Sequence, residues 1–291
     1  MSILVLKFGG TSVSKKSNWD NISLIIKERL GRVHKVVVVC SALTGISTKL
    51  ENLTLAAAKG DYQEKLQEVK KIHQDMCDEL GIDFQEILGP SFFEFEKLLC
   101  GVAILSDAGP KNWARILSFG ELFSTLLGSA YLKKQQVSNA WLDVREHMLA
   151  SEYETGSLKK RYLEALCECD PDEVLQTKLN QHKENVFITQ GFIARNSAGE
   201  TVLLGRGGSD VSASYLAAKL RSPWLEIWTD VPGMFSANPK AIPEARLLKE
   251  LSYDEAQEIA STGAKVLHPR CIAPVQVHKI PLHVYSTERP D

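Results

Sequence analysis

A buried strand that runs directly into a glycine loop, within residues 3–12, constrains the fold more than any other part of the sequence. Residues 3–6 are a continuous apolar run, which predicts a strand covered on both faces of a parallel sheet. A lysine, two glycines and two hydroxyl residues follow. Glycine lets backbone N–H groups approach a ligand, and hydroxyls can cap a helix or donate to an anion. The segment predicts a phosphate-binding loop, with an ordinary turn and helix cap as the alternative. Its polar and glycine residues are Lys7, Gly9, Gly10, Thr11 and Ser12.

The following residues complete a strand–loop–helix–strand unit. Apolar residues at helical spacing predict a helix over residues 19–30 that Gly31 ends, and residues 36–40 predict a second buried strand. The small-residue loop 41–47 comes at the carboxyl end of that strand, where ligands bind in doubly wound sheets. A strand-to-helix cap without a ligand is the alternative for this loop.

The middle of the chain is predicted to be mainly helical. Residues 47–80 predict two helices broken at 60–61, whereas residues 81–109 have a less regular pattern. A further helix is predicted to begin at residue 119, which places Glu121 in its first turn. A carboxylate there can simply complement the helix dipole, so that position alone does not indicate a ligand. Residues 147–185 predict helices and surface that cover part of a cleft.

Strands recur in the second half of the sequence. Residues 140–144 predict a short strand, and residues 186–194 and 201–204 predict a hairpin. Residues 225–229 and 282–285 predict the last two strands. Because a hairpin departs from a pure strand–helix–strand order, we expect a mixed sheet that is mainly parallel.

A second glycine loop, residues 205–210, joins a predicted strand to a predicted helix and reads Gly-Arg-Gly-Gly-Ser-Asp. It matches neither the P-loop nor the dinucleotide-binding pattern, because Asp210 stands where the latter needs glycine. Arg206 can bind a carboxylate or a phosphate with two parallel hydrogen bonds. Three glycines beside an arginine exceed what turn geometry requires, so we expect this loop to bind a ligand.

Polar residues follow the strand ends in the C-terminal part as well. Thr229 and Asp230 come at the end of a predicted strand, and prolines make residues 230–240 a rigid loop. Lys265 is the second lysine that lies close to a glycine at the end of an element. An exposed surface lysine is the usual interpretation, but the neighbouring motifs favour a ligand role. We expect His268, which precedes a proline, to be structural.

Composition limits the class of protein. The chain has 291 residues and a formal net charge of −2, which gives no indication of a nucleic-acid partner or an anionic membrane. The N-terminus does not resemble a signal peptide, and no apolar run reaches the roughly 18 residues of a membrane span. The six cysteines show no metal-binding spacing. We therefore expect a cytoplasmic protein with reduced thiols.

The charged residues of these motifs suit phosphoryl transfer to an acidic acceptor. Two lysines and an arginine lie close to glycines, whereas the sequence has no Ser-His-Asp arrangement and no His/Cys metal cage. A carboxylate acceptor is already ionised at neutral pH, so it needs no general base. The obstacle is its repulsion from the γ-phosphate of ATP. Lysines, loop N–H groups and Mg²⁺ carried by the ATP phosphates would offset that repulsion, without a metal site of the protein's own.

Six motifs, in order along nearly the whole chain, resemble the signatures of the aspartate kinase family. The resemblance implies the amino-acid-kinase fold, a three-layer α/β/α sandwich with an N-terminal lobe for aspartate (1–200) and a C-terminal lobe for ATP (201–291). It also implies the reaction of ATP with L-aspartate to give ADP and 4-phospho-L-aspartate, the entry to lysine, threonine and methionine biosynthesis. The motifs start at Lys7, Ser41, Phe119, Gly205, Trp228 and Gly263.

The same resemblance implies roles for individual residues. Arg206 would hold the α-carboxylate of aspartate and Glu121 its α-ammonium, while Lys7 would bridge the acceptor and the γ-phosphate. The catalytic residues would be Lys7, Asp210 and Lys265. The aspartate pocket would also contain Ser41, Ser47, Phe192 and Ser209. The ATP contacts would be Lys7, Gly9, Gly10, Thr11, Ser12, Thr229, Asp230, Phe235, Lys240 and Lys265.

The sequence departs from the family in places. The family commonly has Tyr, Asp and Arg where Phe235, Asn238 and Lys240 stand, which weakens the predicted ATP contacts more than the aspartate contacts. The variant 234–239 resembles the form fused to diaminopimelate decarboxylase. The chain ends where most relatives continue into ACT regulatory domains. We therefore expect the kinase region of a larger, bifunctional protein that can form a homo-oligomer.

Two other functions are compatible with these residues. The first is a kinase of the same fold for another acid, such as glutamate or an N-acyl amino acid. The Arg206 loop argues against it, as does Glu121 if that side chain binds a free amine. The second is a catalytically silent module that binds a nucleotide or an amino acid for regulation. The presence of both Lys7 and Lys265 argues against that function.

Overall fold

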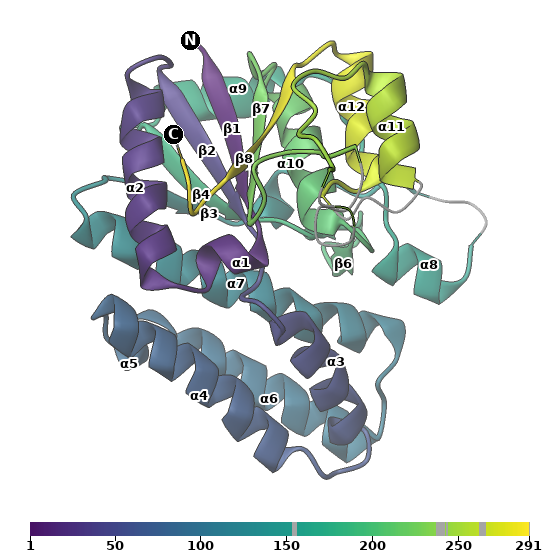
Figure 1. Ribbon diagram of the computed structural model, residues 1–291. Coiled ribbons are helices and arrows are strands. Elements are labelled where there is room, and N and C mark those ends of the chain that lie inside the picture. Colours follow the sequence, from purple (N-terminus) through teal and green to yellow (C-terminus); the bar gives the residue numbers. More distant parts are fainter. Residues whose placement is uncertain (153–155, 237–241, 243, 262–265, 291) are drawn as a thin grey trace.

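A six-stranded parallel sheet forms the centre of the protein in the computed structural model, which describes residues 1–152, 156–236, 242, 244–261 and 266–290. The strand order is β3-β4-β2-β1-β7-β8, and every neighbouring pair is parallel (Figure 1). Strand β1 lies in the middle and is buried throughout, as its apolar run predicts. The strands are β1 (Ile3–Phe8), β2 (Lys35–Cys40), β3 (Ala140–Leu142), β4 (Val186–Gln190), β7 (Leu225–Thr229) and β8 (Leu282–Ser286).

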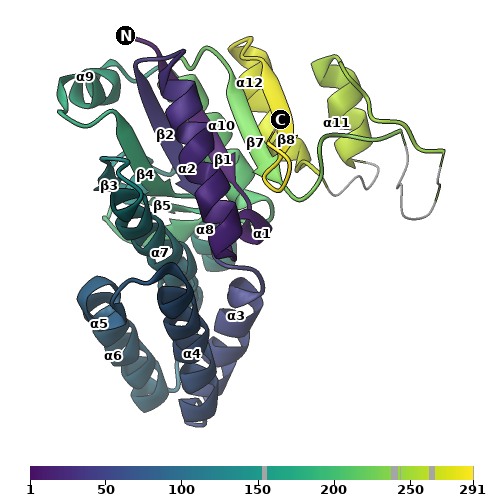
Figure 2. The ribbon, with the colours of Figure 1, turned by 60° about the vertical axis from the view of Figure 1, so that its left-hand side comes forward.

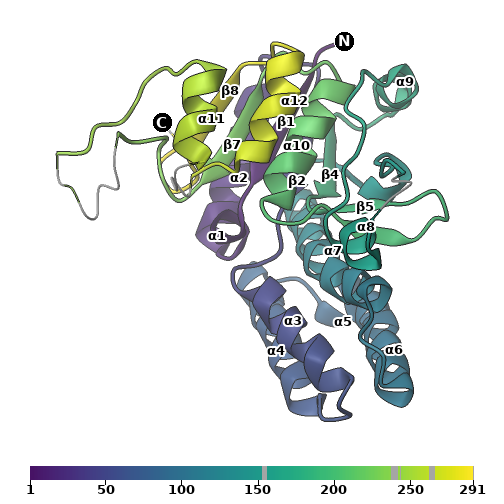
Figure 3. The ribbon, with the colours of Figure 1, turned by 90° about the vertical axis from the view of Figure 1, so that its right-hand side faces the viewer.

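Helices cover both faces of this sheet, so the expected three-layer α/β/α architecture is confirmed. On one face, α2 (Lys16–Leu30) packs beside α7 (Pro110–Lys134). On the other face, α10 (Gly208–Lys219) packs on β1, β2 and β7, and α12 (Ile272–Val277) lies next to it. Figures 2 and 3 show α2 and α10 on opposite sides of the sheet.

A lobe of helices lies at one end of the sheet and contains α3, α4, α5 and α6 (Figure 3). The break predicted at 60–61 is confirmed, because it separates α3 (Ile46–Ala57) from α4 (Gln63–Leu80). Residues 81–109, whose sequence pattern is less regular, are mostly helical, since α5 (Phe84–Ile87) and α6 (Gly89–Leu105) occupy most of this range. The buried residues of α6 lie along one face, but Phe93, Ile104 and Leu105 are apolar and exposed, and this obscures the helical periodicity of its sequence.

Helix α7 is longer than predicted, and this corrects the position of Glu121. The helix begins at Pro110, so Glu121 lies in its interior and cannot complement the N-terminal dipole. The helix approaches its neighbours closely: a Cβ on Gly128 would lie 2.1 Å from Cη2 of Trp19. Glycine at this position lets α7 lie directly against α2 and the sheet.

The predicted hairpin exists, but it does not belong to the main sheet. The expected parallel sheet with an antiparallel hairpin is confirmed, but strands β5 (Ile193–Arg195) and β6 (Thr201–Leu203) form a separate antiparallel pair and do not join the main sheet. The continuous strand predicted over 186–194 breaks after β4, at Phe192, whose φ is 67°. That left-handed conformation turns the chain away from the main sheet.

The other elements are short. Helices α8 (Leu158–Leu163) and α9 (Glu173–Gln181) occupy the segment expected to carry helices, and α1 (Gly10–Val13) follows β1. Among the described residues, no helix is both long and apolar enough to cross a membrane. The remaining elements are η1 (Val144–Glu146), α11 (Tyr253–Ser261) and η2 (Pro269–Cys271).

Candidate active site

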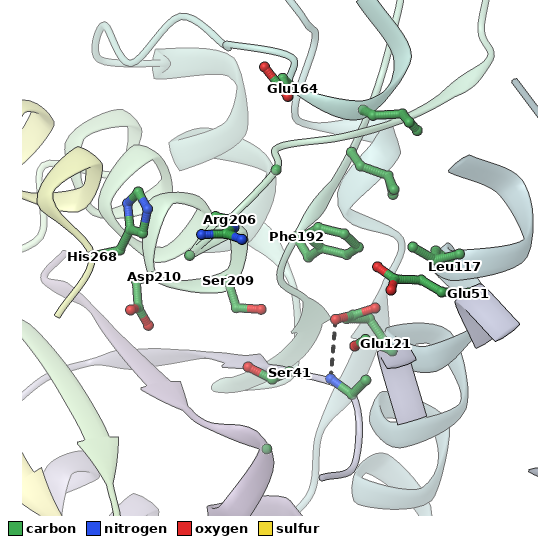
Figure 4. A pocket seen from close by; sticks show the side chains of 18 of the residues that line it. Ser41, Glu51, Leu117, Glu121, Glu164, Phe192, Arg206, Ser209, Asp210 and His268 are labelled. Carbon is green, nitrogen blue, oxygen red and sulfur yellow. Dashed lines mark hydrogen bonds between the residues drawn. The ribbon is translucent and has the colours of Figure 1, made fainter. Parts of the chain in front are cut away.

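A cavity of about 930 Å³ opens where the carboxyl ends of β1, β2 and β4 meet. Figure 4 shows this cavity with side chains contributed by segments far apart in the sequence. Parallel strands place their carboxyl ends at one edge, which is why the loops after them converge. The predicted site residues that line it are Lys7, Gly10, Ser41, Ser47, Glu121, Phe192, Arg206, Ser209 and Asp210.

An ion pair joins the two glycine loops. The Nζ atom of Lys7, near the end of β1, lies 2.7 Å from Oδ1 of Asp210, in the first turn of α10. The two side chains are only 10% and 13% exposed. Because α10 packs directly on β1, the fold brings together these two charges from distant parts of the chain. Asp210 balances the charge of Lys7 when no ligand is bound, and Lys7 can still reach anionic ligands in the cavity.

A buried carboxylate forms another part of the cavity wall. One oxygen of Glu121 accepts a hydrogen bond of 3.2 Å from the backbone N–H of Ala42, drawn as a dashed line in Figure 4. The other oxygen, Oε2, is buried without a hydrogen-bond partner. Burial raises the pKa of Glu121 to about 8, although the Ala42 N–H opposes this rise. An unpaired buried carboxylate of this kind is suited to a cationic group on a ligand.

The loop 205–208 is fixed by close packing. Gly205 and Gly207 have φ values of 74° and 65°, in the left-handed region that glycine adopts at low cost. A Cβ on Gly207 would lie 2.2 Å from Cγ of His268, and one on Gly208 would lie 2.5 Å from Cδ2 of Phe192. The three glycines predicted to bind a ligand are therefore also needed so that other residues can pack against the loop.

Phe192 is held in its left-handed conformation by neighbouring groups. Its backbone N–H donates to Oγ of Ser212 at 2.8 Å, and its carbonyl accepts from Leu204 N–H at 2.8 Å. Figure 4 shows the Phe192 ring between Arg206 and Glu121. Backbone strain that neighbours maintain is common at functional sites, and here it places an aromatic ring in the cavity wall.

Several predicted nucleotide contacts lie away from this cavity. The hydroxyl of Ser12 is buried and hydrogen-bonds to Oγ1 of Thr287 at 2.7 Å, and Thr229 donates to Asp230 at 3.0 Å. Lys240 and Lys265 are outside the described residues. Gly9, Thr11, Ser12, Thr229, Asp230 and Phe235 are not among the cavity-lining residues.

The cavity also contains residues that the sequence analysis did not identify. Lys159 and Glu164 come from or directly follow α8, in the segment that was expected to cover part of a cleft. Glu51 and Trp113 come from α3 and α7, and Arg270 comes from η2. Glu51 is one of many charges on a helical pattern, so the sequence contained no signal for it. Arg270 directly follows His268 and Pro269, which end the last motif of the sequence, and this position could have indicated it as a site residue.

The acidic residues that the structure describes do not form a metal cage. Within the described part of the chain, no three His, Cys, Asp or Glu side chains are grouped so that they could hold a metal ion. All six cysteines are free thiols, and four of them are buried. Asp210 is the carboxylate beside the cavity lysine, and one carboxylate with ligand phosphates is a usual Mg²⁺ donor set.

Comparison with known proteins gives a consistent result. A model described as the amino acid kinase family matches residues 2–286. The lysine-sensitive aspartokinase 3 of Escherichia coli is 34% identical over 99% of this chain and 62% of its own length. A bifunctional aspartokinase/homoserine dehydrogenase of Buchnera aphidicola is 30% identical over 97% of this chain and 35% of its own length. This chain thus spans less than two thirds of either relative.

A solved structure is similar over the same region. The crystal structure of E. coli aspartokinase III in complex with aspartate and ADP, in its R-state, superposes with a TM-score of 0.82. The two sequences are 32% identical, and the match covers 99% of this chain and 62% of that one.

Proposed function

Because the chain belongs to the amino acid kinase family, we propose that it transfers the γ-phosphate of ATP to the side-chain carboxylate of L-aspartate. The similar structure of E. coli aspartokinase III holds aspartate and ADP, which supports this substrate pair. The products would be 4-phospho-L-aspartate and ADP, in the first step of lysine, threonine and methionine biosynthesis. The chemistry of the cavity is consistent with this reaction.

Aspartate would bind through its charged groups. Glu121 offers a carboxylate oxygen without a partner, which suits the α-ammonium, and Arg206 offers the two parallel donors that suit the α-carboxylate. The Phe192 ring lies between these two charges (Figure 4). Ser41, Ser47 and Ser209 add hydroxyl groups to the same cavity, which can donate to a carboxylate. Opposite charges on one wall favour an amino acid over a simple dicarboxylate.

Lys7 would lower the barrier by neutralising charge. The acceptor carboxylate and the γ-phosphate are both anionic, and their approach is the main obstacle to the reaction. The Nζ of Lys7, already at the edge of the cavity beside Asp210, can stabilise the additional negative charge as the two groups meet. Asp210 would keep the lysine oriented before the substrates bind. No general base is required, since the aspartate side chain is ionised at neutral pH.

The nucleotide would bind mainly through the C-terminal part, residues 201–291, and aspartate mainly through residues 1–200, with Arg206 and Ser209 added from the C-terminal part. Lys240 and Lys265 remain predicted ATP contacts, together with Thr229, Asp230 and Phe235. Gly9 and Gly10, with Thr11 and Ser12, would form the loop between the two substrates. Mg²⁺ would be held by the ATP phosphates, with Asp210 as the nearby carboxylate, and would offset phosphate charge when bound.

The observation on which this proposal mainly rests is the unpaired Glu121 carboxylate in the same cavity as Arg206 and the Lys7–Asp210 pair. The test is ADP release measured with L-aspartate, L-glutamate and N-acetyl-L-aspartate. We expect activity with L-aspartate, weak activity with glutamate and none when the amine is blocked. A preference for either alternative acid would refute the assignment, and binding of ATP and aspartate without turnover would indicate a regulatory module.

The biological setting is also proposed by analogy. Relatives of this chain are longer, and several are bifunctional proteins that carry a homoserine dehydrogenase. We propose that the kinase region works within a larger protein, with a fused decarboxylase or regulatory domain and a homo-oligomeric state. The free thiols support a cytoplasmic location. The length and mass of the native protein, measured from its source, would test this.

A further inference from the structure

We infer that Arg270 is a positioning residue of this site, which holds the loop 205–208 so that Arg206 faces the cavity. The inference rests on the proposed function, because it assigns a role in aspartate capture. Arg270 lies in η2, far along the chain from the Arg206 loop, and lines the same cavity.

The guanidinium of Arg270 is occupied by backbone groups. Its Nη1 donates to the carbonyl of Leu204 at 2.6 Å, and its Nη2 donates to the carbonyl of Ala165 at 3.4 Å. Leu204 directly precedes the glycine loop, and Ala165 follows the short helix α8. One side chain thus joins two backbone segments at the edge of the cavity. Because both terminal nitrogens of Arg270 donate to backbone carbonyl groups, the side chain can fix this part of the cavity wall.

Two further contacts from the same segment reach the loop and the helix that follows it. The ring of His268 packs where a side chain on Gly207 would stand, at 2.2 Å from the position of a Cβ. The carbonyl of Cys271 accepts a hydrogen bond of 2.7 Å from Oγ of Ser214, on α10. Residues 268–271 therefore contact the chain before, within and after the loop that carries Arg206.

This arrangement explains how an exposed arginine can have a defined direction. The loop contains three glycines, whose free backbone would otherwise adopt many conformations. Arg206 is exposed and makes no hydrogen bond or ion pair with another residue of the described ranges. The contacts of Arg270 and His268 with the loop backbone supply the constraint instead. Preorganisation of this kind lowers the entropic cost of binding a carboxylate.

Kinetics of Arg270→Gln and Arg270→Lys test the role. Losing a charge-assisted hydrogen bond that positions Arg206 should raise KM for aspartate about tenfold in Arg270→Gln. We expect KM for ATP to change less than about twofold and kcat to stay similar, with Arg270→Lys intermediate. Arg32→Gln, which changes an exposed arginine just after α2, is the matched control. Equal increases in both KM values, or no increase for aspartate, would overturn the inference.

A double-mutant cycle separates positioning from general damage. If Arg270 acts through Arg206, then Arg270→Lys should have little further effect on aspartate KM in an Arg206→Ala background. Additive effects would contradict this coupling. The Lys variant keeps the test usable if the Gln variant does not fold.

Hydrogen exchange tests the contact without any substrate. Amides of residues 204–210 should exchange faster in Arg270→Lys than in the wild type, whereas those of β2 should not. Unchanged exchange would overturn the positioning role even if the protein is an aspartate kinase. Conversely, a wild type that is inactive with aspartate would refute the proposed function. The exchange experiment would still test whether Arg270 holds the loop.

Discussion

Lys7 and Asp210 form an ion pair of 2.7 Å between the first strand of the protein and the helix that follows its second glycine loop. Neither residue could be placed beside the other from its own sequence neighbourhood. The pair arises because α10 packs against β1 at the centre of the sheet. It places a lysine of the cavity next to a carboxylate that can hold it until anionic substrates compete.

The first prediction concerns Lys7. Lys7→Ala should lower kcat by about 10²–10³, because it removes the positive charge between two anionic reactants. KM for aspartate should change much less, since the proposed amino-acid contacts are Arg206 and Glu121. Steady-state kinetics at saturating ATP check this. Lys27→Ala, on the solvent side of α2, is the control, and near-normal turnover in Lys7→Ala would refute the proposed role.

The second prediction concerns the pH dependence of aspartate binding. Burial raises the pKa of Glu121 to about 8 in the free protein, so the carboxylate is largely protonated at lower pH. The charged form is needed to pair with an ammonium group. KM for aspartate should therefore fall as the pH rises from about 6.5 towards 8. Glu121→Gln should raise KM and remove this dependence.

The stability of Glu121→Gln is an independent test, because this variant should become more stable although it binds aspartate more weakly. The folded-state pKa of Glu121 lies above its unfolded value, so ionisation costs stability as the pH rises from 4.5 towards 8. Glu121→Gln removes this cost, and its melting temperature at pH 8 should exceed that of the wild type. A variant that loses both aspartate affinity and stability would contradict our account of the buried charge.

The sheet and much of the site were predictable because they depend on local sequence. Continuous apolar runs identified β1 and β2, and the glycine loops that follow strands identified Lys7 and Arg206. Glu121 was found through its motif, but its place in the helix was wrong. Helix α7 is buried on several sides and begins nine residues before Phe119, so its apolar pattern did not show where it starts.

Tertiary contacts explain the other failures. The break at Phe192 depends on Ser212 and Gly208, which are distant in sequence and hold a left-handed residue that no local preference predicts. The role inferred for Arg270 likewise depends on its hydrogen bonds to carbonyl groups of residues that are distant in sequence. Local patterns predict elements, whereas the contacts between loops at one sheet edge require the assembled structure.

The third prediction tests the strained residue. Ser212→Ala removes the oxygen that accepts the Phe192 N–H and should destabilise the protein by about 1–3 kcal/mol, because that N–H is left unpaired. It should also raise KM for aspartate, since the ring would no longer be held between Arg206 and Glu121. Chemical denaturation and kinetics measure the two effects. Ser17→Ala, at an exposed position in α2, is the control, and unchanged stability would contradict the role of this hydrogen bond.

The fourth prediction concerns a buried polar cluster between the sheet and helix α2. Glu226 accepts hydrogen bonds from Nε of Arg29 at 2.7 Å and from the indole nitrogens of Trp224 and Trp228 at 2.7 and 3.0 Å. Glu226→Gln leaves the Arg29 guanidinium without its buried counter-charge and should lower the free energy of unfolding by about 3 kcal/mol. Glu28, which also contacts Arg29, is half-exposed, and Glu28→Gln should cost far less.

The fifth prediction follows from a buried histidine in the helical lobe. The His73 ring packs against Phe92 and Phe123, and Nδ1 lies 2.8 Å from the carbonyl of Val69. Burial lowers the pKa of His73 to about 4, so the folded protein keeps it neutral while the unfolded chain takes up a proton near its ordinary pKa. The unfolded state therefore binds more protons between pH 4 and 6.5. The contribution of His73 to the free energy of unfolding is therefore fully present above pH 6.5. It is lost as the pH falls towards 4, and the loss amounts to roughly 3 kcal/mol.

Comparison with a variant isolates this contribution from other titrating groups. His73→Leu keeps an apolar side chain between the aromatic rings and cannot take up a proton. The difference in unfolding free energy between variant and wild type should therefore shift in favour of the variant as the pH falls from 7 to 4. Denaturant titrations at several pH values measure this difference, with His34→Leu at an exposed site as the control. A difference that does not change with pH would show that His73 is not held neutral by the aromatic cluster.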